Sequence, residues 1–243
     1  MKLDGKTALV TGAAGNGLGR SIALTLARDG ANVAVNYRSS ADKAQKIVDH
    51  IIAQGGKATA VQGDIFTAEG VQHLVADAQA VFGPVDICII GPGGEFHVTA
   101  LDETDAAMAL KNVTDETAPL FHLMSAVLPG MYARNWGRII GIGTHPTRLS
   151  PSFTYNAGKM ARMQALLLMR DECWQHGVTV NIIAPGPVDP IEDLADAVDL
   201  SNHGATWQKR ENVTPQDAAE AIAFLCSDAG NYISGCVLPL LFR

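Results

Sequence analysis

The sequence predicts an α/β fold in which helices cover both faces of one doubly wound parallel sheet of seven strands. Short runs rich in Val, Ile and Ala alternate along the chain with longer segments of helical period, and this alternation is typical of βαβ units. The short runs are apolar at successive positions, which indicates strands buried on both faces. The chain has 243 residues, of which 47% are hydrophobic and 18% charged, so we assign residues 1–243 to a single domain.

The first βαβ unit begins with a strand at residues 7–11. A glycine-rich turn follows, then a helix with an apolar residue at every fourth position, which Gly30 ends. Pro239 cannot donate to a ladder, so the last strand is predicted at a sheet edge. The other strands are expected at residues 31–36, 58–62, 85–90, 138–143, 179–183 and 237–241, and the other helices near residues 41–54, 68–81, 103–134, 155–175 and 215–227.

Composition excludes several classes of partner. Acidic residues outnumber Lys and Arg by 25 to 18, a formal net charge of −7, so the chain lacks the positive charge that holds nucleic acid or an anionic membrane. The four cysteines are far apart in the sequence, so we expect buried thiols and no metal site. Neither a signal peptide nor an apolar run of about 18 residues is recognisable, and we expect a cytoplasmic protein.

The turn after the first strand is the first candidate binding site. Residues 11–20 read TGAAGNGLGR, so a strand runs through glycines into a helix, where backbone N–H groups and the helix dipole hold a pyrophosphate. A tight turn without a ligand is the alternative, but the position in the first of several βαβ units favours a nucleotide. We expect cofactor contacts at Gly12, Asn16, Gly17 and Leu18.

The end of the second strand predicts which dinucleotide binds. A site for NAD places an acid there to accept hydrogen bonds from the ribose, whereas a site for NADP supplies a cation for the 2′-phosphate. This strand ends in Asn-Tyr followed by Arg38 and two serines, with no acid. Arg38 and Ser39 therefore favour NADP(H) over NAD(H).

Tyr155 and Lys159 are four residues apart at the start of an apolar helix, so their side chains share one face. Because a nearby ammonium favours phenolate, we expect Lys159 to lower the pKa of Tyr155 from its reference value of about 10. Tyr155 could then exchange a proton with a carbonyl or alcohol oxygen. The spacing also occurs in surface pairs, so the position in the fold must decide.

Three stretches, the glycine turn, residues 155–159 (YNAGK) and residues 181–188 (NIIAPGPV), resemble the short-chain dehydrogenase/reductase family in their order and separation. The resemblance is strongest to the bacterial 3-oxoacyl-acyl-carrier-protein reductase-like branch. It implies a single Rossmann-like domain, an NAD(P) cofactor, hydride transfer between nicotinamide and an alcohol or ketone carbon, and a homotetramer or homodimer. It makes Tyr155 the acid/base and has Lys159 lower its pKa and hold the nicotinamide ribose.

Further cofactor contacts follow from the same resemblance. They are Asp64, Ile65, Gly91, Pro92, Gly93, Pro185, Gly186 and Val188, beside Tyr155 and Lys159. We expect residues 185–213, which carry two early prolines and then a cluster of acids, to form a loop with a short helix that acts as a substrate lid.

The sequence also departs from the family. The glycine spacing, from Gly12 to Gly17, is one residue longer, so the phosphate loop must be reshaped. Where the family has Asn-Asn-Ala-Gly, residues 90–94 read IGPGG. Two side-chain amides are lost, and the hydrogen bonds that they make must come from elsewhere or be left out.

Two catalytic positions differ as well. The family's catalytic serine falls on Thr144, two residues closer to Tyr155 than usual; the hydroxyl is retained, although this Thr could also simply end a strand. The family's relay asparagine falls on Glu116. Glu116 either carries protons or pairs with Lys159 and weakens its effect on Tyr155.

The principal hypothesis is an NADP(H)-dependent carbonyl reductase that acts on a small molecule, with Tyr155, Lys159, Thr144 and Glu116 at the catalytic site. Two others stay open: a cofactor-binding protein with degraded chemistry, and an NAD-linked alcohol dehydrogenase. The aromatic substrate-side candidates are Phe96, His97, Phe153 and Trp207, which suit an aromatic or cyclic ketone.

Overall fold

The computed structural model describes residues 2–98, 101–145, 151–205 and 210–240. Its centre is one seven-stranded sheet with the strand order β3-β2-β1-β4-β5-β6-β7, and every neighbouring pair is parallel. The predicted fold class is therefore confirmed. The strands are β1 (Thr7–Val10), β2 (Asn32–Tyr37), β3 (Lys57–Gln62), β4 (Ile87–Ile90), β5 (Gly137–Ile142), β6 (Val178–Ala184) and β7 (Val237–Pro239).

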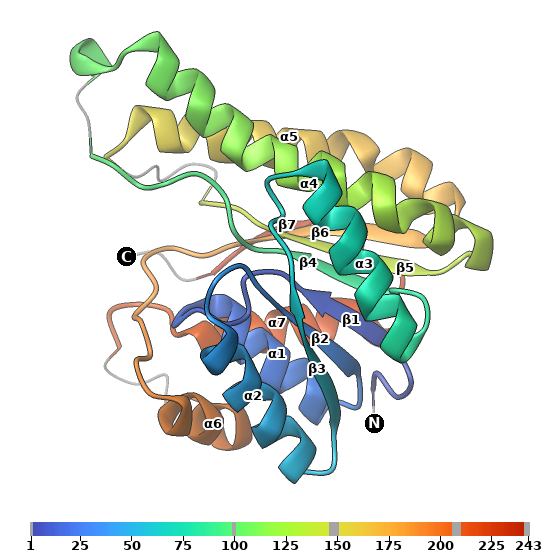
Figure 1. The fold of residues 1–243 in the computed structure, drawn as a ribbon. Helices are drawn as coiled ribbons and strands as arrows, with labels where there is room; N and C mark the ends of the chain where they lie inside the picture. Colours follow the sequence, from blue (N-terminus) through green and yellow to red (C-terminus); the bar gives the residue numbers. More distant parts are fainter. Residues whose placement is uncertain (1, 99–100, 146–150, 206–209, 241–243) are drawn as a thin grey trace.

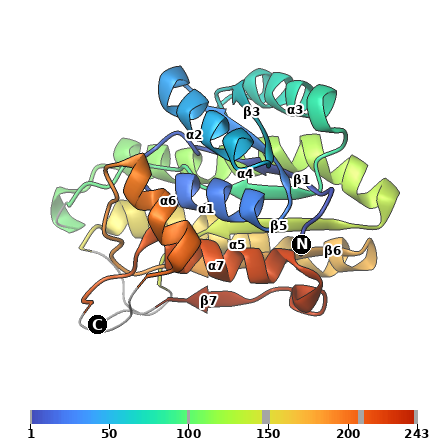
Figure 2. The ribbon, with the colours of Figure 1, turned by 90° about the horizontal axis from the view of Figure 1, so that it is seen from below.

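Helices cover both faces of the sheet (Figures 1 and 2). One layer holds α1 (Leu18–Arg28), α2 (Ala41–Ala53), α6 (Leu194–His203) and α7 (Pro215–Cys226). The other holds α3 (Ala68–Phe82), α4 (Ala106–Arg134) and α5 (Phe153–Gln175). In the described ranges, short 3₁₀ helices lie at Leu101–Glu103 and Asp228–Gly230.

Each helix layer packs against the sheet in its own hydrophobic core, and one strand can contribute side chains to both cores. Ala8 and Val10 of β1 face the core of α1, α2, α6 and α7, whereas Leu9 between them faces the core of α3, α4 and α5. All three are fully buried. Side chains alternate between the faces of a strand, so the uninterrupted apolar runs of the sequence are explained by burial on both sides.

In two long helices the first residue differs from the prediction, because it is set by the N-cap residue that precedes it. α4 begins at Ala106, because the Asp105 side chain accepts a hydrogen bond from the Met108 N–H at 2.7 Å. α5 begins at Phe153, two residues before Tyr155, because Ser152 is the N-cap and accepts from the Tyr155 N–H at 3.4 Å. Tyr155 therefore lies within the first turn of a capped helix.

β1 and β4 are neighbours at the point where the strand order reverses, which is where open α/β sheets bind ligands. Thr11 ties the ends of these strands together. Its hydroxyl donates to the Ile89 carbonyl at 2.7 Å and accepts from the Gly91 N–H at 3.0 Å. The glycine turn and the loop after β4 are thereby held side by side.

β7 is the last strand of the order, which confirms the edge position predicted from Pro239. The Cys236 carbonyl accepts from the Ile182 N–H at 2.9 Å, and the Leu240 N–H donates to the Ala184 carbonyl at 3.1 Å. Successive residues alternate in the direction of their backbone groups, so the missing N–H of Pro239 faces outward and costs no hydrogen bond to β6.

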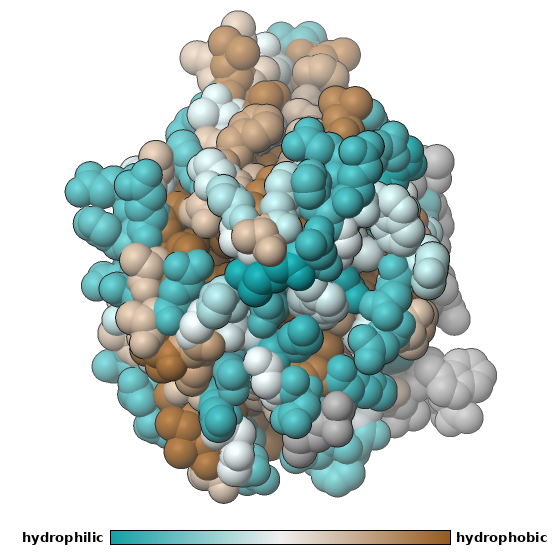
Figure 3. All heavy atoms as spheres, turned by 90° about the vertical axis from the view of Figure 1, so that its right-hand side faces the viewer, coloured by the Kyte–Doolittle hydropathy of each residue, from teal (hydrophilic) through white to brown (hydrophobic). Residues whose placement is uncertain are grey.

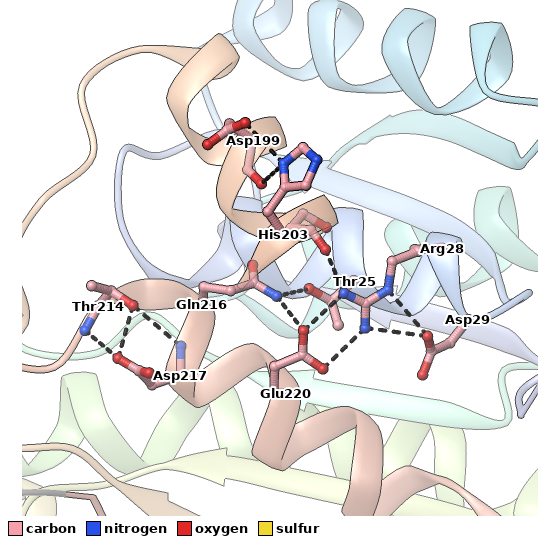
Figure 4. A network of polar contacts seen from close by, with 10 residues as sticks. Thr25, Arg28, Asp29, Asp199, His203, Thr214, Gln216, Asp217 and Glu220 are labelled. Atoms are coloured by element: carbon pink, nitrogen blue, oxygen red, sulfur yellow. Dashed lines mark hydrogen bonds and ion pairs between the residues drawn. The ribbon is translucent and has the colours of Figure 1, made fainter. Parts of the chain in front are cut away.

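The segment 185–213 contains a short helix, α6, as the sequence indicates. Its two ends meet where Val188 and Val213 form an isolated bridge. Arg28 of α1 holds α6 and α7 together (Figure 4): it donates to the Ser201 carbonyl and pairs with Glu220 at 2.8 Å. α6 is thus fastened to the body of the domain.

On the face drawn in Figure 3, hydrophilic side chains lie across the middle and apolar side chains occur in small groups. Large apolar side chains are nevertheless exposed on α4 and α5, among them Leu110, Phe121 and Leu168. Within the ranges that the structure describes, no helix is long and apolar enough to cross a membrane.

Candidate active site

The glycine turn is shaped by two close approaches. Gly12 has a φ of 63°, and a Cβ there would lie 2.5 Å from Cγ of Pro92. A Cβ on Gly19 would lie 2.7 Å from the Gly12 carbonyl oxygen. Gly17 differs, because a Cβ there would meet nothing within 4 Å. The longer turn therefore keeps glycine where chain segments touch and leaves open space in front of Gly17.

Asn16, in the longer glycine turn, contacts the segment 185–213. Its side-chain amide donates to the Glu192 carboxylate at 2.6 Å, and Lys43 donates to its amide oxygen at 3.4 Å. Arg20 donates to the Ile191 carbonyl nearby. Leu18 packs against the hydrophobic core, so its side chain faces the protein interior.

A cavity of about 580 Å³ opens where β1, β2, β3 and β4 end. It brings together seven of the predicted cofactor residues, namely Gly12, Arg38, Ser39, Asp64, Ile65, Pro92 and Gly93. The other predicted cofactor residues do not line it; they are Asn16, Gly17, Leu18, Gly91, Tyr155, Lys159, Pro185, Gly186 and Val188. A second cavity, of about 340 Å³, lies at the opposite end of β2 and β3 and contains no predicted site residue.

Arg38 is an exposed cation at the rim of the large cavity. Its guanidinium carbon lies 5.9 Å from the centroid of the Phe66 ring. Within the described part of the chain, that guanidinium has no ion pair and donates no hydrogen bond. The exposed Ser39 and Ser40 follow it directly, so a cation and two hydroxyls lie together at this rim.

Tyr155 and Lys159 share one face of α5. The Lys159 Nζ lies 5.4 Å from the centroid of the Tyr155 ring. The Tyr155 ring also meets Phe96 edge-on, with the ring centroids 5.2 Å apart and an interplanar angle of 89°. Lys159 is buried and Tyr155 is half-buried, so the pair is not a solvated surface pair.

Glu116 is fully buried beside this pair and contacts two cations. Its Oε1 lies 3.1 Å from the Lys159 Nζ and accepts from the Gly94 N–H at 2.9 Å. Its Oε2 lies 2.9 Å from the Arg162 Nε. Glu116 was expected either to carry protons or to pair with Lys159, and in the structure it is paired with Lys159.

The pKa of Tyr155 is raised, not lowered as the Tyr155–Lys159 spacing predicts. Burial raises the pKa of Tyr155 to about 12, and the Glu116 carboxylate adds to the rise, while Arg162 opposes it. Burial and the Arg162 charge lower the pKa of Lys159 to about 8, against the opposing effect of Glu116. The ammonium lies against a carboxylate, so its field at the phenol is offset.

Arg162 is the site residue that the sequence reasoning missed. It is fully buried, and its guanidinium donates to four carbonyl groups around the site: Glu116 at 2.8 Å, Gly91 at 3.1 Å, Ile142 at 3.5 Å and Pro92. The bonds to Gly91 and Pro92 hold the loop after β4, so Arg162 anchors the loop where the two side-chain amides are lost. The sequence feature that could have identified Arg162 is its spacing, because a cation three residues after Lys159 lies on the same face of the helix.

Thr144 follows β5 at the same edge of the sheet and is 8% exposed. Its N–H contacts the Met163 sulfur at 3.5 Å. Pro185 and Gly186 follow β6, so the ends of strands β1 to β6 all carry predicted site residues. Trp207 lies outside the described residues.

This edge fits a dinucleotide. The N-terminus of α1 has no side-chain cap and no acid in its first turn, which leaves its N–H groups for an anion in front of Gly17. The cavity lies between that turn and the Arg38 cation. Among the described residues, no group of three His, Cys, Asp or Glu side chains could hold a metal ion.

A model of the short chain dehydrogenase family matches residues 6–198. The chain belongs to this family. It is therefore an oxidoreductase with a Rossmann-like fold for NAD(P). Among curated relatives, a probable tetrahydroxynaphthalene reductase of Zymoseptoria tritici is 33% identical over 98% of this chain and 94% of its own length. A 3-oxoacyl-acyl-carrier-protein reductase of Staphylococcus epidermidis is 30% identical over 95% of both chains, in agreement with the resemblance to that branch of the family.

Solved structures of the family have the same fold. A 7α-hydroxysteroid dehydrogenase complexed with NADH and 7-oxo glycochenodeoxycholic acid superposes with a TM-score of 0.84 at 30% identity, covering 98% of this chain and 94% of that chain. A short chain dehydrogenase from Burkholderia cenocepacia in complex with NADP has a TM-score of 0.80 at 29% identity, covering 99% and 98%. Both forms of the cofactor thus occur among its structural relatives.

Proposed function

We propose that this protein reduces a cyclic ketone with NADPH. The observation that carries the proposal is the Tyr155–Lys159 pair at the start of α5, in which Lys159 is buried and Tyr155 half-buried. When bound, the nicotinamide would supply the hydride that adds to the carbonyl carbon. The chain supplies the proton, the orientation of the carbonyl and the exclusion of water.

Tyr155 is the proton donor. With a pKa of about 12, the phenol keeps its proton at neutral pH and can donate it to the oxygen of the reduced carbonyl. Thr144, at the end of β5, orients the same oxygen through its hydroxyl. A protonated phenol suits reduction better than alcohol oxidation, which needs a base, and this supports the reductive direction.

The substrate side is aromatic. Phe96 packs edge-on against Tyr155, and both Phe96 and Phe153 are 51% exposed, so a flat or cyclic substrate would find apolar contacts beside the phenol. The fungal relative is named as a tetrahydroxynaphthalene reductase, and the steroid dehydrogenase is in complex with 7-oxo glycochenodeoxycholic acid. Both names support a cyclic substrate.

Arg38 supports NADP(H) as the cofactor. Among the described residues its guanidinium has no ion-pair partner, and it lies at the rim of the cavity next to two serine hydroxyls. A guanidinium binds a phosphate through two parallel hydrogen bonds. Segment 185–213 would act as the lid, through its contacts with Asn16 and Arg20.

An oligomer, either a homodimer or a homotetramer, belongs to the proposal. Leu168 on α5 is 75% exposed and Leu110 on α4 is 67% exposed, and exposed large apolar side chains on neighbouring helices favour burial between subunits.

One observation favours a second function, that of a cofactor-binding protein with weak chemistry. The Lys159 ammonium is already paired with Glu116 at 3.1 Å, which reduces the help that it gives to Tyr155.

The test measures NADPH oxidation with a panel of bicyclic, monocyclic and linear ketones. We expect Tyr155→Phe to lose at least about 100-fold in kcat while NADPH binding, followed by its fluorescence, is unchanged. Tyr232→Phe, at a residue that is 90% exposed, is the matched control. Unchanged turnover in Tyr155→Phe would refute the mechanism, and tight NADPH binding without turnover on any ketone would support the second function.

A further inference from the structure

We infer that Arg162 is a positioning residue of this reaction: it neutralises the buried carboxylate of Glu116, so that one positive charge remains available at Tyr155. This inference rests on the proposed function, which it deepens.

The three charged side chains form a closed group. Glu116 and Arg162 are fully buried and Lys159 is 6% exposed. The carboxylate lies 3.1 Å from one cation and 2.9 Å from the other. Burial removes water from all three, so each charge depends on the other two for its stabilisation.

The balance of charge in this group decides what Tyr155 experiences. Two cations and one carboxylate leave one net positive charge. Without Arg162, Glu116 and Lys159 would form a neutral pair, and the carboxylate would raise the pKa of the phenol with Lys159 alone to oppose it. Arg162 is in fact a cation that lowers the pKa of Tyr155 in the structure, against the effects of burial and Glu116.

The packing around Glu116 leaves it little freedom to move away. A Cβ on Gly93 would collide with its carboxylate, and a Cβ on Gly158 would lie 3.0 Å from its Cγ. The Gly94 N–H fixes one carboxylate oxygen from the loop side. The Glu116 carboxylate is therefore closely packed between α5 and the loop after β4.

Arg162 also anchors the loop after β4 through the carbonyls of Gly91 and Pro92. A purely structural role would consist of this anchoring alone. The two roles are separable, because removing Glu116 restores the charge balance of an Arg162 variant but cannot restore the lost bonds to the loop.

The experiment compares Arg162→Met, Glu116→Gln and the double variant. We expect Arg162→Met to lose about 100-fold in kcat for ketone reduction. The midpoint of its plot of kcat against pH should move to higher pH. The double variant should recover to within about tenfold of wild type. Arg170→Met, which removes an exposed arginine from the same helix, is the matched control and should leave kcat unchanged. A double variant as slow as Arg162→Met would overturn the charge-balance role and leave only the anchoring.

A second measurement does not depend on turnover. The phenolate absorbance of Tyr155, taken as the difference between each protein and its Tyr155→Phe partner, reports the ionisation of this phenol directly. Glu116→Gln leaves two cations and should shift the midpoint to lower pH by about one unit, a tenfold change. An unshifted midpoint would refute the inference. If wild type reduces no ketone but the midpoint shifts, the proposed function fails and the charge balance stands; Glu116→Gln also decides the case if Arg162→Met does not fold.

Discussion

The carboxylate of Glu116 lies 3.1 Å from the ammonium nitrogen of Lys159, inside the protein and away from solvent. Lys159 is therefore not an isolated cation beside Tyr155. It belongs to a group of three charges that also contains Arg162, and the proton chemistry of the site depends on the group as a whole.

The first prediction concerns pH. The pKa of Lys159 is lowered to about 8, so the ammonium is present below that pH and is lost as the pH rises through it. Since Tyr155 stays protonated to about pH 12, we expect kcat for ketone reduction to fall above about pH 8 because of Lys159. Lys159→Arg keeps its charge at every accessible pH and should move this fall to higher pH. A fall at the same pH in both proteins would assign it to another group.

The second prediction uses Arg38. Arg38→Ala should raise the Kd for NADPH by about 10- to 100-fold, the value of a charge-assisted hydrogen bond, and leave the Kd for NADH nearly unchanged. Titration of the cofactor fluorescence gives both constants. Lys46→Ala removes an exposed cation of α2 that does not line the cavity and serves as the control. Equal loss for both cofactors would remove Arg38 from phosphate recognition.

The third prediction separates two glycines. Gly93→Ala drives a methyl group into the Glu116 carboxylate, so we expect it to reduce the free energy of unfolding by about 1–3 kcal/mol and to lower kcat. Gly17→Ala meets nothing within 4 Å and should change the melting temperature little, yet weaken NADPH binding, because the methyl group enters the space in front of α1. If Gly17→Ala binds NADPH as well as wild type, the pyrophosphate lies elsewhere.

The fourth prediction tests how α6 is held. Arg28→Met removes the bond to Ser201 and the pair with Glu220 (Figure 4). Because this pair is partly exposed, we expect a loss of about 1 kcal/mol or less in the free energy of unfolding. Amide hydrogen exchange should rise in α6 (Leu194–His203) and stay unchanged in α3 (Ala68–Phe82). If amide exchange in α6 is as slow in Arg28→Met as in wild type, α6 is held by apolar packing alone.

Much of the fold could be predicted because its signals are local. Most strands are short apolar runs, although β3 (KATAVQ) also carries polar residues. Pro239 indicates an edge strand because it lacks an N–H group. The ends of α4 and α5 were less accessible, since they depend on which side chain becomes the cap.

The site was predictable only in part, because its electrostatics come from residues far apart in the chain. Arg162 and Glu116 are 46 positions apart, and neither pattern alone indicates that both are buried in contact. The wrong sign of the Tyr155 pKa shift has the same origin: the spacing of Tyr155 and Lys159 is local, whereas the pKa is raised mainly by burial of the phenol and then by the Glu116 carboxylate from α4, and both depend on the fold.

The outward direction of Pro239 has a consequence for handling the protein at high concentration. A free sheet border invites another polypeptide to dock as an extra strand, which is how ordered aggregates grow. Along the outer edge of β7 the row of backbone donors has a gap, because the nitrogen of Pro239 carries no hydrogen to donate to an incoming strand. We therefore expect growth of such aggregates from this border to be blocked at Pro239, and the border to become a nucleation point when this single residue is replaced by valine.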